Sequence, residues 1–209
     1  MKFFTMTMAL LSAISHLNAV VAPNEGLQSL IDGNARYMKH QLIHPNMGFE
    51  TRIEAVQGQD PYAIILGCAD SRVPPEIIFD QGIGDLFVVR VAGNVLGASE
   101  FDSMLFAIKN FSSSVVLILG HKGCGAVKAV LNGKAGDLQA IGVMIEPAVD
   151  QAKKESKNNA LDRAIELNVE YMVDQLRAVP FIKAAVNQQK LQVVGGVYDL
   201  ETGKVNLLK

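Results

Sequence analysis

The sequence predicts an α/β fold: a mostly parallel central β-sheet flanked by helices, with a C-terminal antiparallel edge hairpin. Short apolar runs that end in glycine, at residues 62–67 and 115–120, are typical of strands that are buried on both faces. The segments between the expected strands carry apolar residues at helical spacing. Strands that alternate with helices favour a parallel sheet.

The size and composition of the chain indicate one globular core. Its 209 residues are 49% hydrophobic and 19% charged, which is ordinary for a folded domain and excludes a disordered one. The net charge of −2 gives no basic surface for phosphates, so no nucleic-acid partner is expected.

The first residues differ from the rest of the chain. Lys2 precedes an apolar run over residues 3–17, which predicts a signal peptide over 1–19 with cleavage after Ala19. Cleavage after Ala22 is less suitable, because Pro23 would follow the cut. We therefore expect a single domain over 20–209 that is exported, to the periplasm or outside the cell. No other run is long enough to span a bilayer, so no membrane contact is expected after leader removal.

The alternative for this leader is an N-terminal helix that packs on a neighbouring subunit. In that case the segment would not be cleaved and the protein would stay in the cytoplasm.

Proline, glycine and apolar spacing place the expected elements along the chain. In order, they are a helix from Asn24 as N-cap to about residue 38, an irregular segment 41–60, a strand 62–66, a short helix after Pro74 and Pro75, a strand 86–90, a helix 99–111, a strand 115–119, a helix 125–131, a helical segment 137–154 broken or kinked at Pro147, a helix from 158 or 159 that stops at Pro180, a strand 191–198, and a hairpin strand 204–208. His40 and His44 share the four-residue spacing of a weak metal pair, but Pro45 favours a solvated helix end.

Residues that bind metals follow two of these strands. Cys68 and Asp70 come after the first strand, and His121 and Cys124 follow the strand that ends at Gly120. Because the carboxyl ends of parallel strands meet at one edge of a sheet, these side chains are expected to lie together. Two thiolates and an imidazole suit zinc, with water or Asp70 as the fourth ligand.

Asp70 and Arg72 form a second feature of this segment. They are two residues apart and so face the same way as Cys68 in an extended chain. An arginine that holds the carboxylate by paired hydrogen bonds would keep it off the metal and let it orient zinc-bound hydroxide. The alternative is an ordinary salt bridge that fixes a loop.

Two other interpretations of the cysteines remain open. Cys68 and Cys124 could form a disulfide in an exported protein, although a disulfide does not explain Asp70 or His121. Cys68 could instead be a nucleophile with His121 as its base, which leaves Cys124 and Arg72 without a role.

The same residues resemble the β-class carbonic anhydrases. The family pattern is Cys-x-Asp-x-Arg followed by His-x-x-Cys, and the matching segments are Cys68-Ala69-Asp70-Ser71-Arg72 and His121-Lys122-Gly123-Cys124-Gly125. The resemblance extends to residues 33–37, 87–90, 93–94 and 195–199, and so covers nearly all of the chain after the leader.

The resemblance implies reversible hydration of carbon dioxide to bicarbonate and a proton. It implies one zinc per subunit on Cys68, His121 and Cys124, with Asp70 and Arg72 as the orienting pair. It also implies substrate-side roles for four residues: Gln59, Phe87, Phe106 and Gly125. Members of the family form dimers with sites near the subunit interface, often doubled into tetramers, so a homodimer or homotetramer is expected.

Some members of the family close the site by binding the aspartate to zinc. They lock that state with bicarbonate held by a Trp, an Arg and a Tyr. This chain has no Trp, which predicts the simpler open type, with Asp70 reaching the metal only if its grip on Arg72 loosens at low pH.

Two alternatives use the same zinc ligands. One is a hydrolase of carbonyl sulfide or carbon disulfide, and the other is a non-catalytic zinc-binding protein.

Overall fold

The computed structural model describes residues 21–136, 138–155 and 158–208. The expected signal peptide over residues 1–19 and its cleavage site after Ala19 lie outside the described residues. The helices and strands are α1 (Pro23–Met38), α2 (Phe49–Glu54), η1 (Ala55–Gln57), β1 (Ala63–Cys68), α3 (Pro75–Ile78), β2 (Leu86–Val91), η2 (Ala92–Asn94), α4 (Ala98–Asn110), β3 (Val115–His121), α5 (Gly125–Leu131), α6 (Gln139–Glu155), α7 (Ala160–Arg177), α8 (Pro180–Asn187), β4 (Gln192–Tyr198) and β5 (Val205–Leu207).

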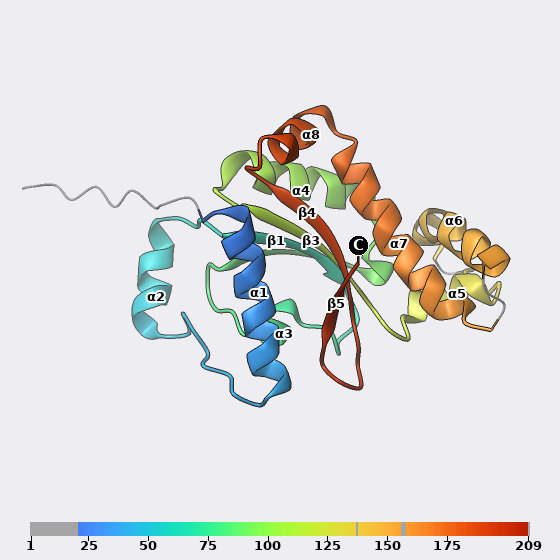
Figure 1. Ribbon diagram of the computed structural model, residues 1–209, viewed down its shortest axis with the longest axis horizontal. Coiled ribbons are helices and arrows are strands. Elements are labelled where there is room, and N and C mark those ends of the chain that lie inside the picture. Colours follow the sequence, from blue (N-terminus) through green and yellow to red (C-terminus); the bar gives the residue numbers. More distant parts are fainter. Residues whose placement is uncertain (1–20, 137, 156–157, 209) are drawn as a thin grey trace, which may run out of the picture.

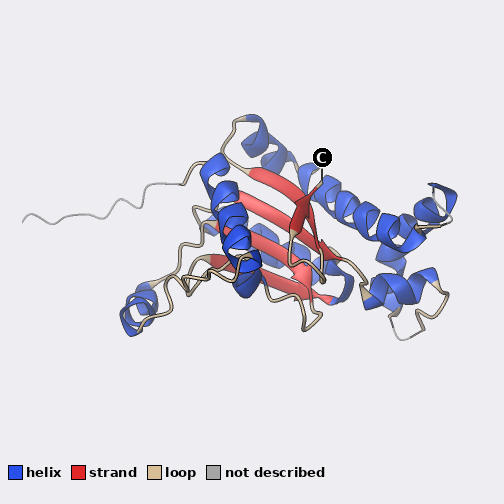
Figure 2. Cartoon of the chain, turned by 60° about the horizontal axis from the view of Figure 1, so that its bottom comes forward, coloured by secondary structure: helices blue, strands red, loops and turns tan. Residues whose placement is uncertain are grey.

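The sheet is mostly parallel, which confirms the predicted fold class. Among the described residues, five strands lie in the order β2-β1-β3-β4-β5 (Figures 1 and 2). The first four are parallel, and β5 pairs antiparallel with β4 as the expected edge hairpin. Cys68 pairs with Val91 and His121 with Tyr198, so both expected ligands lie at the carboxyl edge of the sheet.

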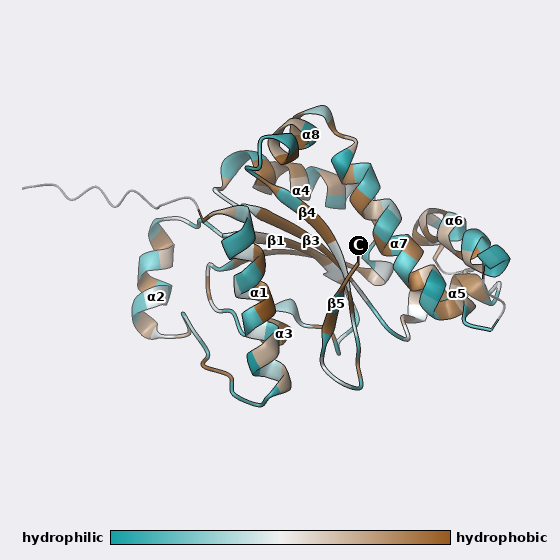
Figure 3. Ribbon diagram, viewed as in Figure 1, coloured by the Kyte–Doolittle hydropathy of each residue, from teal (hydrophilic) through white to brown (hydrophobic). Residues whose placement is uncertain are grey.

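Helices cover both faces of the sheet and create two apolar cores. Ile64 and Leu66 of β1 pack in the larger core, to which α4, α6 and α7 contribute. The alternate residues Ala63 and Ile65 face the opposite core, to which α1 and α3 contribute. Strands β1 and β3 are therefore apolar on both faces up to the glycine before their last residue, and brown predominates along this part of the sheet in Figure 3.

The side chain of Asn34 connects helix α1 to α3 and to the C-terminal β4–β5 hairpin. Its Nδ2 donates to the carbonyl oxygen of Gly203 at 2.8 Å and to that of Ile78 at 3.2 Å. Its Oδ1 accepts the Val205 amide at 2.9 Å, so one buried amide group satisfies three backbone groups of α3 and the β4–β5 hairpin.

Four details differ from the sequence-based prediction. Helix α1 begins at Pro23 rather than after an Asn24 cap, because proline is favoured in the first turn, where no N–H partner is needed. The segment 41–60 contains α2 and η1, and α8 follows Pro180. Helix α6 runs through Pro147, since the unpaired carbonyl of Val143 belongs to a residue that is 69% exposed and can be hydrated. No helix in the described part of the chain has the length and apolar character needed to cross a membrane.

Candidate metal centre

Two strand ends and one helix start form the site. Cys68 is the last residue of β1, and His121 is the last residue of the neighbouring β3. Gly123, with φ of 65°, then turns the chain so that Cys124 directly precedes α5. The predicted meeting of these three residues at the carboxyl edge of the sheet is confirmed.

The three side chains have the geometry of a metal site. The sulfur atoms of Cys68 and Cys124 and a ring nitrogen of His121 all lie within 4.8 Å of one another. All three residues are buried, with His121 fully so. Ligands of tetrahedral zinc at bond lengths of about 2.3 Å for sulfur and 2.0–2.1 Å for nitrogen fit within this spacing.

His121 is oriented for a metal. Its Nδ1 lies 3.0 Å from the carbonyl oxygen of Lys122, so Nδ1 carries the proton and Nε2 is left with a lone pair. Nε2 is buried and has no hydrogen-bond partner among the described residues. A buried polar atom without a partner is costly, and a cation between the two sulfurs would satisfy it.

Cys68 and Cys124 are both buried and form no disulfide. A hydrogen bond from Cys124, with smaller contributions from His121 and two backbone amides, lowers the pKa of Cys68 to about 4. The hydrogen bond to the Cys68 thiolate, together with burial, raises the pKa of Cys124. The lowered pKa favours the thiolate form of Cys68, which is the form that binds metals.

Two backbone contacts hold Cys68. The Gly93 amide donates to its Sγ at 3.3 Å. Arg90 of β2 donates from Nε to the carbonyl oxygen of Cys68 at 2.9 Å and from Nη2 to that of Asp70 at 2.6 Å. The sulfur, the backbone of the ligand and the backbone of the following carboxylate are therefore fixed together.

Asp70 faces the cluster but is bound to Arg72. Arg72 Nε donates to Oδ1 at 2.9 Å and Nη2 to Oδ2 at 2.7 Å, while Oδ2 lies 3.8 Å from His121 Nε2. The hydrogen bonds from Arg72 hold the pKa of Asp70 well below its usual range. The carboxylate is therefore ionised, adjacent to the three ligands and outside their cluster.

The family model described as carbonic anhydrase matches residues 63–205, which span the whole cluster. The β-carbonic anhydrase CafA of Aspergillus fumigatus superposes with a TM-score of 0.72 at 29% identity, over 88% of this chain and 90% of that one. The chain belongs to the β-class carbonic anhydrases.

Bacterial relatives support the assignment over nearly the full length. The carbonic anhydrase of Mycolicibacterium smegmatis is 34% identical over 195 residues, covering 88% of this chain and 93% of the relative. Carbonic anhydrase 2 of Mycobacterium tuberculosis is 32% identical over 192 residues, covering 88% and 92%. The chain is thus a carbonate dehydratase, which is a lyase.

Of the four residues expected on the substrate side of this carbonic anhydrase, only Gly125 adjoins a metal ligand. Gly125 begins α5 directly after Cys124, and a Cβ there would meet open space. Gln59 precedes the amino-terminal end of β1 and is exposed, at the opposite end of the strand from Cys68.

Phe87 and Phe106 form an aromatic group with Phe111. The Phe87 and Phe111 ring centroids are 5.7 Å apart, and the Phe106 ring meets the same Phe111 edge-on at 5.7 Å. Phe87 pairs with Ile64, four residues before Cys68 along the strand, and Phe106 is 53% exposed. Within one chain, the structure does not bring Gln59, Phe87 or Phe106 to the metal ligands.

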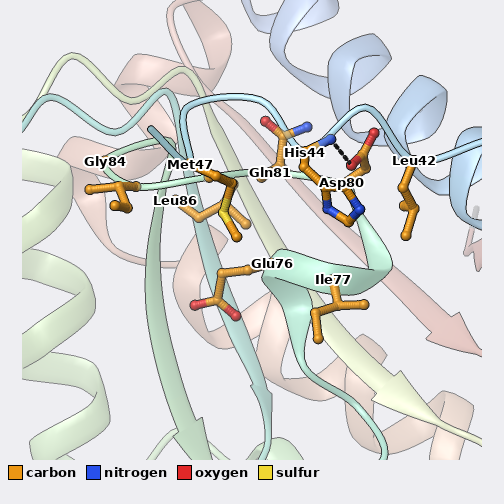
Figure 4. Close-up of a pocket in the computed structure, with 11 residues that line it drawn as sticks. Leu42, His44, Met47, Glu76, Ile77, Asp80, Gln81, Gly84 and Leu86 are labelled. Atoms are coloured by element: carbon orange, nitrogen blue, oxygen red, sulfur yellow. Dashed lines mark hydrogen bonds between the residues drawn. The ribbon is translucent and has the colours of Figure 1, made fainter. Parts of the chain in front are cut away.

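A separate cavity of about 330 Å³ lies beside the amino-terminal end of β2 (Figure 4). Leu86, Met47 and Ile77 line it, and the Asp80 carboxylate at its wall accepts the His44 backbone amide at 3.0 Å. His44 is exposed and lies beyond the end of α1, in agreement with the prediction of a solvated helix end at this point of the chain. The cavity shares no residue with the metal cluster.

Three residues at the centre had no role in the prediction from sequence. Arg90 and Gly93 lie in segments that carry the family resemblance, but sequence alone does not show what they bind. Asn168 of α7 donates to the Gly93 carbonyl oxygen at 2.9 Å. In the sequence, Asn168 could have been noticed only as a polar residue within the apolar stripe of this helix.

Proposed function

We propose that the protein catalyses the reversible hydration of carbon dioxide to bicarbonate and a proton, with one zinc ion held by Cys68, His121 and Cys124. The observation that carries this proposal is the buried cluster of two sulfurs and an unpartnered His121 Nε2, in a member of the carbonic anhydrase family. The soft sulfur donors favour zinc over magnesium or calcium.

When bound, zinc supplies a Lewis acid that lowers the pKa of water towards neutrality. The chain's own contribution is orientation. Asp70 accepts a hydrogen bond from the water that adds to carbon dioxide and so directs an oxygen lone pair at the carbon. Because Arg72 lowers its pKa, Asp70 is a poor base, and the released proton passes to solvent or buffer.

We propose that Gln59, Phe87 and Phe106 act across the interface of a homodimer. Their distance from the ligands of their own chain supports this. Phe87 also lies on β2, whose outer edge is unpaired among the described strands, and Phe106 lies on α4, which packs against β2. Two relatives from Sordaria macrospora are tetrameric, and such a tetramer could be built from two of these dimers.

Hybrid dimers test this arrangement. We expect the Cys124→Ser chain to be inactive alone and the Phe87→Ala chain to be weakly active alone. Mixed and reassembled, they should recover activity, because one site then has intact ligands and an intact Phe87 from the partner. A mixture no more active than its components would show that Phe87 serves only its own chain.

We also propose that residues 1–19 are removed on export, on the basis of the charge and apolar pattern of that segment. Expression of the full chain in a bacterium with fractionation tests this. A periplasmic protein that begins at residue 20 is expected, and an uncleaved cytoplasmic protein would refute it.

Metal content and substrate choice test the activity itself. We expect about one zinc per chain by elemental analysis and hydration of carbon dioxide in a stopped-flow assay. A zinc protein that hydrolysed carbonyl sulfide but did not hydrate carbon dioxide would overturn the proposal, as would zinc binding with neither activity.

A further inference from the structure

Asn168 is a buried polar residue in the middle of α7. It is 1% exposed, and its neighbours Leu167 and Val169 in the sequence are buried core residues. Its Oδ1 is buried without a hydrogen-bond partner among the described residues. Burying an unpaired acceptor is costly, so an apolar residue would suit this position better for stability alone.

The donor side of Asn168 explains its presence. Nδ2 donates to the carbonyl oxygen of Gly93 at 2.9 Å, across 75 positions of sequence. The amide of the same Gly93 donates to Cys68 Sγ at 3.3 Å. One glycine therefore connects the α7 side chain to a sulfur of the metal cluster.

The conformation of Gly93 makes this connection specific. Its φ of 73° and ψ of 14° lie in the left-handed region that glycine adopts readily. A Cβ at this position would come within 2.8 Å of Ile145 Cδ1, so α6 packs directly against the turn. The Asn168 hydrogen bond restrains the Gly93–Asn94 peptide group through its oxygen, on the other side of the Gly93 Cα from the amide that meets Cys68.

We propose that Asn168 is a positioning residue for the metal ligand Cys68: it holds Gly93 so that the Gly93 amide donates to the thiolate. This inference rests on the proposed metal site. A hydrogen bond to a thiolate withdraws electron density from sulfur, so Asn168 tunes how strongly Cys68 donates to the metal. Contacts of this kind, one step beyond the ligands, commonly change metal affinity or activity by about 10–100-fold.

Cobalt substitution of the Asn168→Leu protein tests the proposal by a signal that a merely structural role would not move. Leucine keeps the branching at Cγ and removes the donor. The expected result is a sulfur-to-cobalt charge-transfer band at longer wavelength than in wild type, because a thiolate without its hydrogen bond is more easily oxidised. Zinc affinity is expected to fall by about 10-fold, because the loss of a fixed position for Cys68 outweighs the stronger donation from its sulfur.

Leu176→Val is the matched control. Leu176 is fully buried in the same helix, about 12 Å further along its axis at 1.5 Å per residue. It should lower the melting temperature and leave the band in place. A band in Asn168→Leu that matches wild type and the control would overturn the proposal.

A measurement on wild-type protein covers the case in which Asn168→Leu does not fold. With a magnetically active cadmium isotope in the site, scalar coupling between cadmium and the Gly93 amide proton is expected through Cys68 Sγ. Absence of this coupling would overturn the proposal. Wild-type protein that binds cobalt without any sulfur band would instead show that the metal site itself is wrongly assigned, and both proposals would fall.

Discussion

Arg72 grips the carboxylate of Asp70 with three donors: its own backbone amide at 3.0 Å from Oδ1, Nε at 2.9 Å from Oδ1, and Nη2 at 2.7 Å from Oδ2. The two guanidinium bonds form the parallel fork that only arginine can supply. The arginine side chain is 57% exposed, so the pair adds little to stability and its importance lies in where it aims the carboxylate.

Arg72→Lys tests that role. Lysine keeps the charge but cannot make the fork, so Asp70 is expected to lose its fixed direction, and kcat for carbon dioxide hydration to fall on the order of 10²-fold. Zinc content and melting temperature should stay near wild type. Arg52→Lys, an exposed change on α2, is the control. Equal activity in the two variants would show that Asp70–Arg72 is only a salt bridge.

Arg90→Gln tests the second arginine. The substitution removes the donor pair that binds the carbonyl oxygens of Cys68 and Asp70, at 2.9 and 2.6 Å. We expect a loss of about 10-fold or more in kcat/KM with zinc still bound, since the ligand and the carboxylate are no longer held in register. Hydrogen exchange should show faster exchange of the amides in residues 69–72; unchanged exchange and activity would contradict this role.

The acid stability of the α6–α7 pair should depend on Arg163. Its Nε binds Glu155 at 2.6 Å and its Nη1 binds Glu170 at 3.0 Å. The hydrogen bond from Arg163 lowers the pKa of Glu155 below its ordinary value of 4.5. A lowered pKa in the folded state stabilises above the unfolded value, and this contribution is lost as pH falls below about 4.5.

Urea unfolding of Arg163→Met and wild type measures this effect. We expect the variant to be less stable at pH 7 and the difference to shrink as pH falls through the range below 4.5. Because these side chains are partly exposed, high salt should reduce the difference as well. A difference independent of both pH and salt would contradict the ion-pair explanation.

Much of the fold follows from local pattern. The apolar runs at β1 and β3 have the length of a strand and end in a glycine, which identifies them as buried strands. Once they are parallel neighbours, Cys68 and His121 must share an edge of the sheet. The cluster could therefore be predicted from sequence spacing before any contact was known.

Other features depend on contacts that no local pattern records. Helix α2 is six residues long and buries none of them, so the segment is too short for a helical period to identify it. The acceptors of Arg90 lie 20 and 22 residues away, and that of Asn168 lies 75 residues away. Strand pairing and helix packing create these contacts, so they appear only in three dimensions.

The substrate-side residues show a different limit. Gln59 and Phe87 were assigned by resemblance, and a single chain does not bring them to the ligands. Their role stays a prediction that depends on a second subunit, which neither the sequence pattern nor the fold of one chain contains.

The most direct test of the account is stopped-flow carbon dioxide hydration on protein of measured zinc content, with Cys124→Ser and Asp70→Ala beside wild type. We predict about one zinc per chain and fast hydration in wild type, loss of both in Cys124→Ser, and loss of hydration alone in Asp70→Ala. Chelation should abolish the wild-type activity and added zinc restore it. Wild-type protein without zinc, with Cys68 and Cys124 joined as a disulfide, would contradict the account.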